Sequence, residues 1–270
     1  MSRPTAQIQA IYRYPVKGLS AEALSRVALS VGATLPADRL YAIENGPSGF
    51  DPAAPAYLPK QRFLMLMQHE RLAALRTQFD TASHTLTITA ENREAARGDL
   101  RTAAGRAAIE QFFAAYCTNE LRGPPRILTA PEHSFSNMRP GPSGIQAGHS
   151  FSDVAQKAVS IINLASVAEV ENAVGAPVHP LRFRGNVYVA GWPAWHEFNL
   201  IGEEIAIGTV RLKVVRRTKR CAATNVEPDT GIRDLNIPQT LMRTFGHADC
   251  GIYTEVVAAG EIAVGDKIGK

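Results

Sequence analysis

The sequence predicts a mixed α/β protein that is rich in strands, organised as β barrels with a few flanking helices. Short stretches in which apolar and polar residues alternate recur along the chain, as half-buried strands require. Few stretches have the three-to-four-residue apolar spacing of a helix. Apolar residues make up 45% of the 270 residues, which is enough to bury a sizeable core and excludes a disordered chain.

The first third of the chain is expected to be mostly strands. Residues 84–90 place Leu86 and Ile88 between threonines, as a half-buried strand does. Residues 46–60 are rich in Gly and Pro and predict a loop, whereas residues 69–79 have a short helical pattern. Earlier strands are expected at residues 8–12, 22–31 and 39–44.

The middle of the chain predicts two helices and a second long loop. Residues 102–117 carry apolar side chains at helical spacing, and residues 138–150 form the loop. A strand at 158–162 is followed by a helix from about residue 164. Asn163 is the expected N-cap of that helix, and Gly175 ends it.

The last third again favours strands. The spacing predicts a strand in which Leu181, Phe183, Val187 and Val189 share one face. Further strands are expected around residues 205–207 and 210–214, a short helix at 237–246, and two closing strands after residue 251.

Composition limits the functions and locations that are expected. The start of the chain lacks the apolar core of a signal peptide, and no window approaches the length of an apolar membrane span, so we expect a soluble cytoplasmic protein with no membrane partner. Three separated cysteines argue against a disulfide framework or a cysteine-rich zinc site. A net charge of +4 permits an anionic ligand without calling for nucleic acid.

The strongest chemical signal surrounds Cys221. Residues 211–220 contain six cations, and Cys221 follows them directly. Nearby cations stabilise a thiolate, which makes Cys221 the best candidate for a nucleophile or a soft-metal ligand. The alternative is a buried cysteine beside a solvated basic strand.

A second signal is the segment LRFRGN. Strand alternation places Arg182, Arg184 and Asn186 on one face, where two guanidiniums and an amide suit a phosphate or another planar anion. The alternative is an ordinary polar outer face. Lys17 and Arg39 stand at predicted strand edges, where basic residues are often merely solvated. Ser166 opens a predicted helix and is either an anion contact or an ordinary first-turn serine.

Several familiar motifs are missing from the sequence. There is no HExxH zinc motif, no Walker A sequence, no GxSxG elbow and no GxGxxG after a strand.

Six segments, taken in order, resemble the MOSC superfamily, which is named for the C-terminal domain of molybdenum cofactor sulfurases. They are YPVKG, ADRLYAIENG, RFRGN, RCAATNVEPDTG, FGHADCGIYTEV and IAVGD. The resemblance implies a MOSC N-terminal β-barrel-like domain over residues 1–122 and a MOSC β-barrel domain over residues 123–270. The layout is similar to that of the mitochondrial amidoxime-reducing component and of bacterial reductases of N-hydroxylated bases.

The resemblance also implies a cofactor and a site. Cys221 would be the catalytic residue and would ligate the molybdenum of a molybdopterin cofactor; pyridoxal phosphate is not required. Gly18 and Lys219 stand where the reductases tend to have serine, and Glu227 stands where they have aspartate. The implied cofactor contacts are Lys17, Gly18, Arg39, Ser166, Arg182, Arg184, Asn186, Lys219, Arg220 and Cys221.

The expected function is reduction of N–O bonds in small N-hydroxylated compounds. The chain has too few cysteines for an iron–sulfur cluster, so electrons would come from a separate donor of ferredoxin, flavodoxin or cytochrome b5-like type. The loops at 46–60 and 138–150 would shape the substrate mouth, with Asn137 and His149 as candidate contacts.

Two other functions stay open. Cys221 could hold a persulfide in a sulfur or molybdenum-cofactor carrier. The basic stretch at 211–220 could bind a phosphorylated ligand or RNA, although it lacks the interleaved aromatic residues of single-strand binders.

Overall fold

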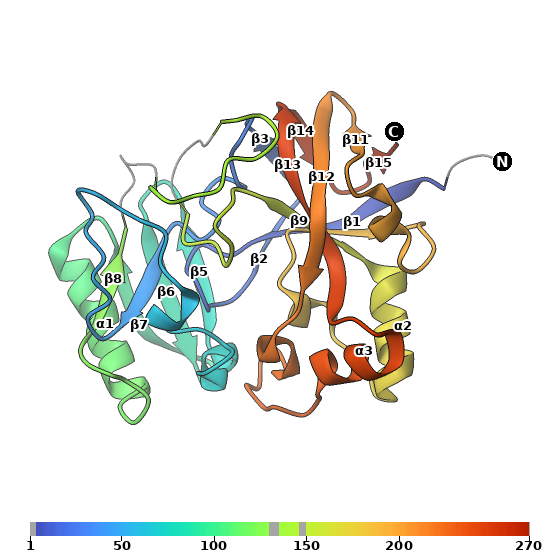
Figure 1. Cartoon of the computed structure of the whole chain (residues 1–270). Helices are drawn as coiled ribbons and strands as arrows, with labels where there is room; N and C mark the ends of the chain where they lie inside the picture. Colours follow the sequence, from blue (N-terminus) through green and yellow to red (C-terminus); the bar gives the residue numbers. More distant parts are fainter. Residues whose placement is uncertain (1–3, 130–134, 146–149, 270) are drawn as a thin grey trace.

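The computed structural model describes residues 4–129, 135–145 and 150–269, and it is a strand-rich mixed α/β protein of two adjoining lobes (Figure 1). The three α-helices of the described residues are α1 (Ala103–Tyr116), α2 (Leu164–Val174) and α3 (Ile237–Phe245). The strands are β1 (Ala6–Arg13), β2 (Glu22–Leu24), β3 (Arg26–Leu29), β4 (Ala42–Asn45), β5 (Arg76–Asp80), β6 (Thr85–Ala90), β7 (Arg93–Asp99), β8 (Pro125–Leu128), β9 (Val159–Asn163), β10 (Val187–Ala190), β11 (Glu204–Ile207), β12 (Val210–Lys219), β13 (Asp249–Ala258), β14 (Gly260–Ala263) and β15 (Lys267–Ile268).

The larger lobe is built on one curled sheet. Its strands follow the order β11-β12-β13-β9-β10-β1-β15, and β2 pairs with β1. The two ends of this order meet, because Ala206 and Gly269 exchange backbone hydrogen bonds of 2.8 and 3.0 Å. The sheet therefore closes on itself around apolar side chains such as Ile161, Leu212 and Ile252. Helices α2 and α3 cover its outer side over a second apolar cluster.

The smaller lobe contains the strands β5-β6-β7, the pair β4-β8 and helix α1 (Figure 1). Ile109 and Phe113 of α1 are fully buried against strand residues such as Leu86 and Ile88. Five short 3-10 helices link elements in the two lobes: η1 (Lys60–Arg62), η2 (Glu70–Ala74), η3 (Pro180–Phe183), η4 (His196–Leu200) and η5 (Ala222–Asn225).

The first strands of the chain are part of the larger lobe. Strand β1 lies between β10 and β15, with Ala6 opposite Ile268, and β3 pairs with β14. The N-terminal segment therefore completes sheets made by the last hundred residues. The division at residues 122 and 123 stays a prediction.

Most of the expected elements are confirmed. The strands expected from 8–12, 22–31, 84–90 and 158–162 are present with small shifts at their ends. Helix α2 begins after Asn163, whose Oδ1 accepts a hydrogen bond from the Ala165 amide, and it ends at Gly175 with φ 74°.

Three expectations about local structure are wrong. Residues 69–79 form η2 and strand β5 rather than one helix, because only five residues bend helically before an extended run. Residues 180–183 are a 3-10 helix and not a strand. Pro180 opens that helix and Arg184 closes it with φ 49°, so alternation does not apply to this segment. The chain closes with three strands rather than two.

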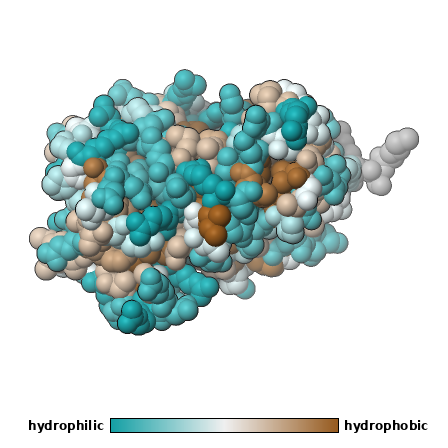
Figure 2. All heavy atoms as spheres, turned by 90° about the horizontal axis from the view of Figure 1, so that it is seen from below, coloured by the Kyte–Doolittle hydropathy of each residue, from teal (hydrophilic) through white to brown (hydrophobic). Residues whose placement is uncertain are grey.

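The surface has no large apolar face in the view from below, where hydrophilic side chains separate small apolar patches (Figure 2). Large apolar side chains that are exposed, such as Ile201, Ile232 and Val264, are scattered over different elements. No helix in the three described ranges is both long and apolar enough to cross a membrane.

Candidate functional site

Of the three cysteines, Cys221 is the one whose thiol is accessible enough to react or to bind a metal. It follows strand β12 directly and is half-buried, with Lys60 Nζ 3.3 Å from its Sγ. Cys117 and Cys250 are buried in apolar clusters. Burial raises the pKa of the Cys117 thiol to about 11 and that of the Cys250 thiol to about 12. A thiolate is therefore disfavoured at both of these positions, and neither lines the cavities described below.

The position of Cys221 is fixed by its neighbour Arg220. The Arg220 amide donates to the carbonyl of Ala248 over 2.7 Å, which holds the end of β12 beside β13. The Arg220 side chain donates through Nε to the carbonyl of Cys250 and through Nη1 to that of Phe183, both over 2.7 Å. Arg220 thus ties together β12, β13 and η3, so the thiol is presented from a rigid corner of the larger sheet.

A cavity of about 190 Å³ opens beside Cys221, and we call it the cationic cavity. Two carboxylates, Asp38 and Asp153, stand among the cations of its wall. Thr218 and Ser160 also line it. Its cationic side chains are Arg39, Lys60, Arg182, Arg184, Arg216, Lys219 and Arg220.

A smaller cavity of about 40 Å³, the junction cavity, is also lined by Cys221. Lys17 forms part of its wall and is almost fully buried. Its Nζ donates to the carbonyl of Phe151 over 2.9 Å and forms an ion pair with Asp153. Burial lowers the pKa of Lys17, and the Asp153 carboxylate opposes this shift. Although burial raises the pKa of Asp153, the charges of Lys17 and Arg39 hold it below its ordinary value.

Arg39 and Arg184 meet over one aromatic ring. Their guanidinium carbons lie 4.7 and 4.3 Å from the centre of the Tyr14 ring. Arg39 Nη1 lies 2.5 Å from Asp38 Oδ2, and its Nη2 donates to the carbonyl of Arg184 over 3.2 Å. Both arginines have left-handed backbone conformations, with φ of 52° and 49°. This arrangement places two cations side by side at one end of the cavity.

The structure brings most of the sequence-predicted residues together. Lys17 and Gly18 line the junction cavity, and Arg39 and Cys221 line both cavities. At Gly18 the backbone φ is 85°, and a Cβ would lie 2.8 Å from the carbonyl of Leu64, so a serine would not fit without movement. The cationic cavity is also lined by the predicted residues Arg182, Arg184, Asn186, Lys219 and Arg220.

Two of these residues have most of their polar groups engaged by the protein, although Arg182 Nε has no hydrogen-bond partner among the described residues. The Arg182 side chain is fully buried, pairs with Glu227 and lies 2.7 Å from Asp234. Asn186 Oδ1 accepts hydrogen bonds from the amide and the hydroxyl of Ser160, over 3.1 and 2.8 Å. These contacts shape the wall, so a bound anion would depend more on the other cations.

Ser166 does not belong to the residues that line the cationic cavity or the junction cavity. Its Oγ donates to Glu197 over 2.7 Å and accepts from the amide of Trp195 over 2.8 Å. The side chain is fully buried and lines neither cavity, because the first turn of α2 faces η4. Burial raises the pKa of Glu197, against the hydrogen bonds from Asn163 and Ser166.

Several wall residues could not be recognised from the sequence. Lys60 opens the one-turn helix η1 and Asp153 lies in a loop, and neither segment has a periodic pattern that shows which side chains turn inward. Ser160 belongs to a strand whose residues are all buried. Thr218 Oγ1 is buried and has no hydrogen-bond partner among the described residues. Such an atom in a cavity wall is a ready donor to a ligand.

The two substrate contacts predicted from the sequence are not confirmed in the cavity walls. Asn137 lines neither of them, and His149 lies outside the described residues. Leu212 and Val214 are buried, which confirms that the cations of 211–220 do not all share one face. Within the described ranges, no group of three or more His, Cys, Asp or Glu side chains could hold a metal ion.

This fold and site define a MOSC-domain protein. The MOSC domain family matches residues 132–269, and the MOSC N-terminal beta barrel domain matches residues 5–119. The chain therefore belongs to the MOSC family.

Its curated relatives include mitochondrial amidoxime reducing component 2 of Bos taurus, which is 30% identical over 122 residues, 41% of this chain and 36% of the relative. Mitochondrial amidoxime-reducing component 1 of Homo sapiens is 28% identical over 120 residues, covering 40% and 35%. The match thus spans about a third of each relative's length. Among solved structures, the YuaD protein from Bacillus subtilis is similar over 99% of this chain and 97% of its own, with a TM-score of 0.44 and 14% identity.

Proposed function

We propose that this protein is a molybdenum-cofactor-dependent reductase of N-hydroxylated compounds, with Cys221 as the ligand to molybdenum. The observation that carries the proposal is the location of the half-buried thiol of Cys221 in the wall of a cavity lined by seven cationic side chains. A thiolate suits a soft metal, and the surrounding cations suit the phosphate of a pterin cofactor. The names of the curated relatives support the reaction class.

The residues present fit an anionic cofactor. Lys17, Arg39 and Arg182 already have carboxylate partners. No carboxylate lies within 4.0 Å of the cationic groups of the other wall cations, as far as the described residues go. The free hydroxyl of Thr218 adds a buried donor beside them. The phosphate would therefore be held by Thr218 together with Arg216, Lys219 and Arg220.

The side chains nearest the thiol would prepare it for this role. Lys60 Nζ, 3.3 Å from Sγ, stabilises the thiolate and carries protons close to the reacting centre. The thiolate in turn raises the pKa of Lys60, against the effect of burial. Asp153, held ionised by Lys17 and Arg39, limits the excess of positive charge around the thiol.

The overall reaction balances with one external reductant. Cleavage of the N–O bond consumes two electrons and two protons and releases the reduced nitrogen compound and water. The cofactor, when bound, would supply the two-electron redox chemistry, and the electrons would come from a separate ferredoxin, flavodoxin or cytochrome b5-like protein. The proposal retains the cytoplasmic location expected from the sequence.

The decisive test compares wild-type protein with Cys221→Ser, both purified from a host that makes the cofactor. Near-stoichiometric molybdenum and pterin fluorescence are expected in wild type, with reduction of an amidoxime by a chemical electron donor. Cys221→Ser should lose at least about 100-fold in activity, because a hard oxygen ligand replaces the soft thiolate sulfur. Cys117→Ala serves as the control cysteine change, since Cys117 lies in an apolar cluster.

A folded wild-type protein without molybdenum or pterin, from a host proven to make the cofactor, would overturn the proposal. Lys60 would equally stabilise a persulfide anion on Cys221, as a sulfur carrier requires. Labelled sulfur that stays on Cys221 in the absence of molybdenum would establish that second function.

A further inference from the structure

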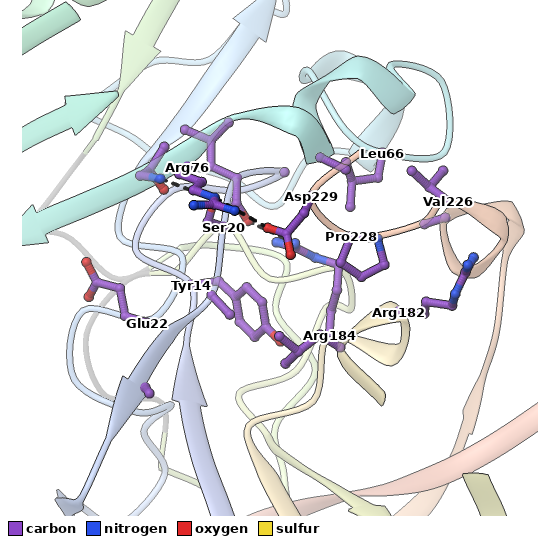
Figure 3. Close-up of a pocket in the computed structure, with 18 of the residues that line it drawn as sticks. Tyr14, Ser20, Glu22, Leu66, Arg76, Arg182, Arg184, Val226, Pro228 and Asp229 are labelled. Atoms are coloured by element: carbon purple, nitrogen blue, oxygen red, sulfur yellow. Dashed lines mark hydrogen bonds and ion pairs between the residues drawn. The ribbon is translucent and has the colours of Figure 1, made fainter. Parts of the chain in front are cut away.

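A third cavity lies between the two lobes, and the proposed reaction has not used it. Its volume is about 490 Å³, within the range of about 300–1,000 Å³ typical of sites for drug-sized ligands. Figure 3 shows Leu66, Val226 and Pro228 along one side of it and Tyr14 and Arg184 along another. Much of its wall is small or apolar, so we call it the apolar cavity; further such lining residues are Leu19, Ala21, Ala23, Ala73, Leu181 and Ala223.

The apolar cavity adjoins the junction cavity. Four residues line both of them, and Cys221 belongs to the wall of the junction cavity. A molecule seated in the apolar cavity therefore lies next to the cavity that the thiol lines. A cavity of about 570 Å³ beside Trp192 and Ile268 shares no lining residue with the cavities around Cys221. The four shared residues are Gly18, Leu66, Arg184 and Ala223.

The charges in the wall of the apolar cavity are largely compensated. Glu22 forms a 2.9 Å ion pair with Arg13, and Arg76 and Asp229 approach within 3.8 Å of each other across one side (Figure 3). Arg182 is paired with two carboxylates, as described above. Arg184 is the lining cation that has no carboxylate within 4.0 Å among the described residues, and it stands at the end shared with the junction cavity.

Two uncharged polar side chains of the wall, Ser20 and Tyr14, are also engaged. Ser20 Oγ donates to the carbonyl of Leu75 over 2.6 Å and accepts from the amide of Thr77 over 3.2 Å. Tyr14 Oη donates to the carbonyl of Gly185 over 3.3 Å. A ligand in this cavity therefore gains mainly by burying apolar surface, with polar recognition concentrated at Arg184.

We propose that the apolar cavity binds the uncharged aryl or alkyl body of the substrate and directs its N–O group toward Cys221 past Arg184. This inference rests on the proposed function and adds a substrate class: neutral N-hydroxylated compounds with a bulky apolar substituent. The Arg184 guanidinium donates to the oxygen of the N–O group, and the residues shared with the junction cavity form the passage.

The test fills the cavity from its partly exposed edge. Ala21→Trp places a large ring in the wall, and Gln78→Trp does so from an exposed position on β5 that tolerates the change if Ala21→Trp folds poorly. Ala28→Trp is the matched control, because Ala28 is exposed on β3 and lines none of the three cavities. We expect the cavity variants to raise the KM for benzamidoxime at least tenfold more than the KM for hydroxylamine, which has no apolar body.

Two further measurements separate this inference from the proposed function. The first is the molybdenum and pterin content of each variant, which should equal that of wild type; a selective loss in both cavity variants would assign the cavity to the cofactor and overturn the inference. The second is titration of the folded protein with benzamidoxime, followed by amide NMR shifts, which needs no activity. Shifts at Leu66 and Ala223 that vanish in the cavity variants support the inference even if the protein reduces nothing. Unchanged binding, or equal changes in KM for both compounds, overturns it.

Discussion

The cationic cavity and the apolar cavity share three wall residues, Arg182, Arg184 and Ala223, yet they are built from opposite materials. Charged side chains crowd the first, and several of them lack a carboxylate partner within the described residues. The second has small apolar side chains, and most of its charges are paired. One wall thus separates a site suited to an anion from a site suited to an uncharged body.

The two cavities differ because different elements of the fold supply their lining side chains. The cationic cavity gathers side chains from β12, η3 and the loops before β4 and β9. The apolar cavity forms where the two lobes meet, between β5 on one side and η3 and the segment after η5 on the other. A change to a paired charge in the first cavity should therefore be costly, whereas a change at the rim of the second should be mild.

The largest effect on stability is expected from Arg39→Met. This change leaves the Asp38 carboxylate buried, at 4% exposure, without the guanidinium that lies 2.5 Å from it. Loss of one partner of a buried pair costs about 3–5 kcal/mol, so the free energy of unfolding in urea should fall by that amount. Lys219→Met is the matched control and should stay within about 0.5 kcal/mol of wild type, because Lys219 is exposed. Equal costs for the two changes would contradict the contrast between paired and solvated cations.

The next effect is a difference in the alkylation rates of the three cysteine thiols. Cys221 should react at least about 100-fold faster than Cys117 and Cys250 at pH 8, because burial blocks both of those thiols and raises their pKa to about 11 and 12. The anion iodoacetate should be favoured over neutral iodoacetamide at Cys221, and added salt should reduce this preference. Lys60→Met should reduce it as well. Identical salt dependence for the two reagents would show that the cations do not act on the thiol.

The smallest effect is expected at the rim of the apolar cavity. Asp229→Asn removes the ion pair with Arg76. The Asp229 side chain is 66% exposed and the Arg76 side chain is 68% exposed. Exposed pairs contribute about 0–1 kcal/mol, so the midpoint of urea unfolding should barely move. A loss above about 2 kcal/mol would mean that this pair joins the two lobes and does not merely border the cavity.

The sequence predicted the features that depend on neighbours along the chain. The cap at Asn163, the end of α2 at Gly175 and the grouping of cations before Cys221 are all local patterns. Lys60 and Asp153 escaped prediction because they reach the site of the thiol from η1 and from a loop, both far from Cys221 in the chain. The strand expected around Arg182 failed because Pro180 starts a 3-10 turn, which pattern alternation does not anticipate.

The pairing of β1 with β15 has a consequence for synthesis of the chain. Ala6 leaves the ribosome early but finds its partner only when Ile268 has been made. Until then the edge of β1 that faces away from β10 lacks its partner at Ala6 and Gln7, and the sheet lacks its last strand. Folding of the larger lobe should therefore finish only after Ile268 has left the ribosome, slowed by contacts between distant parts of the chain. A nascent chain stalled before residue 260 should remain sensitive to protease in the segment around β1.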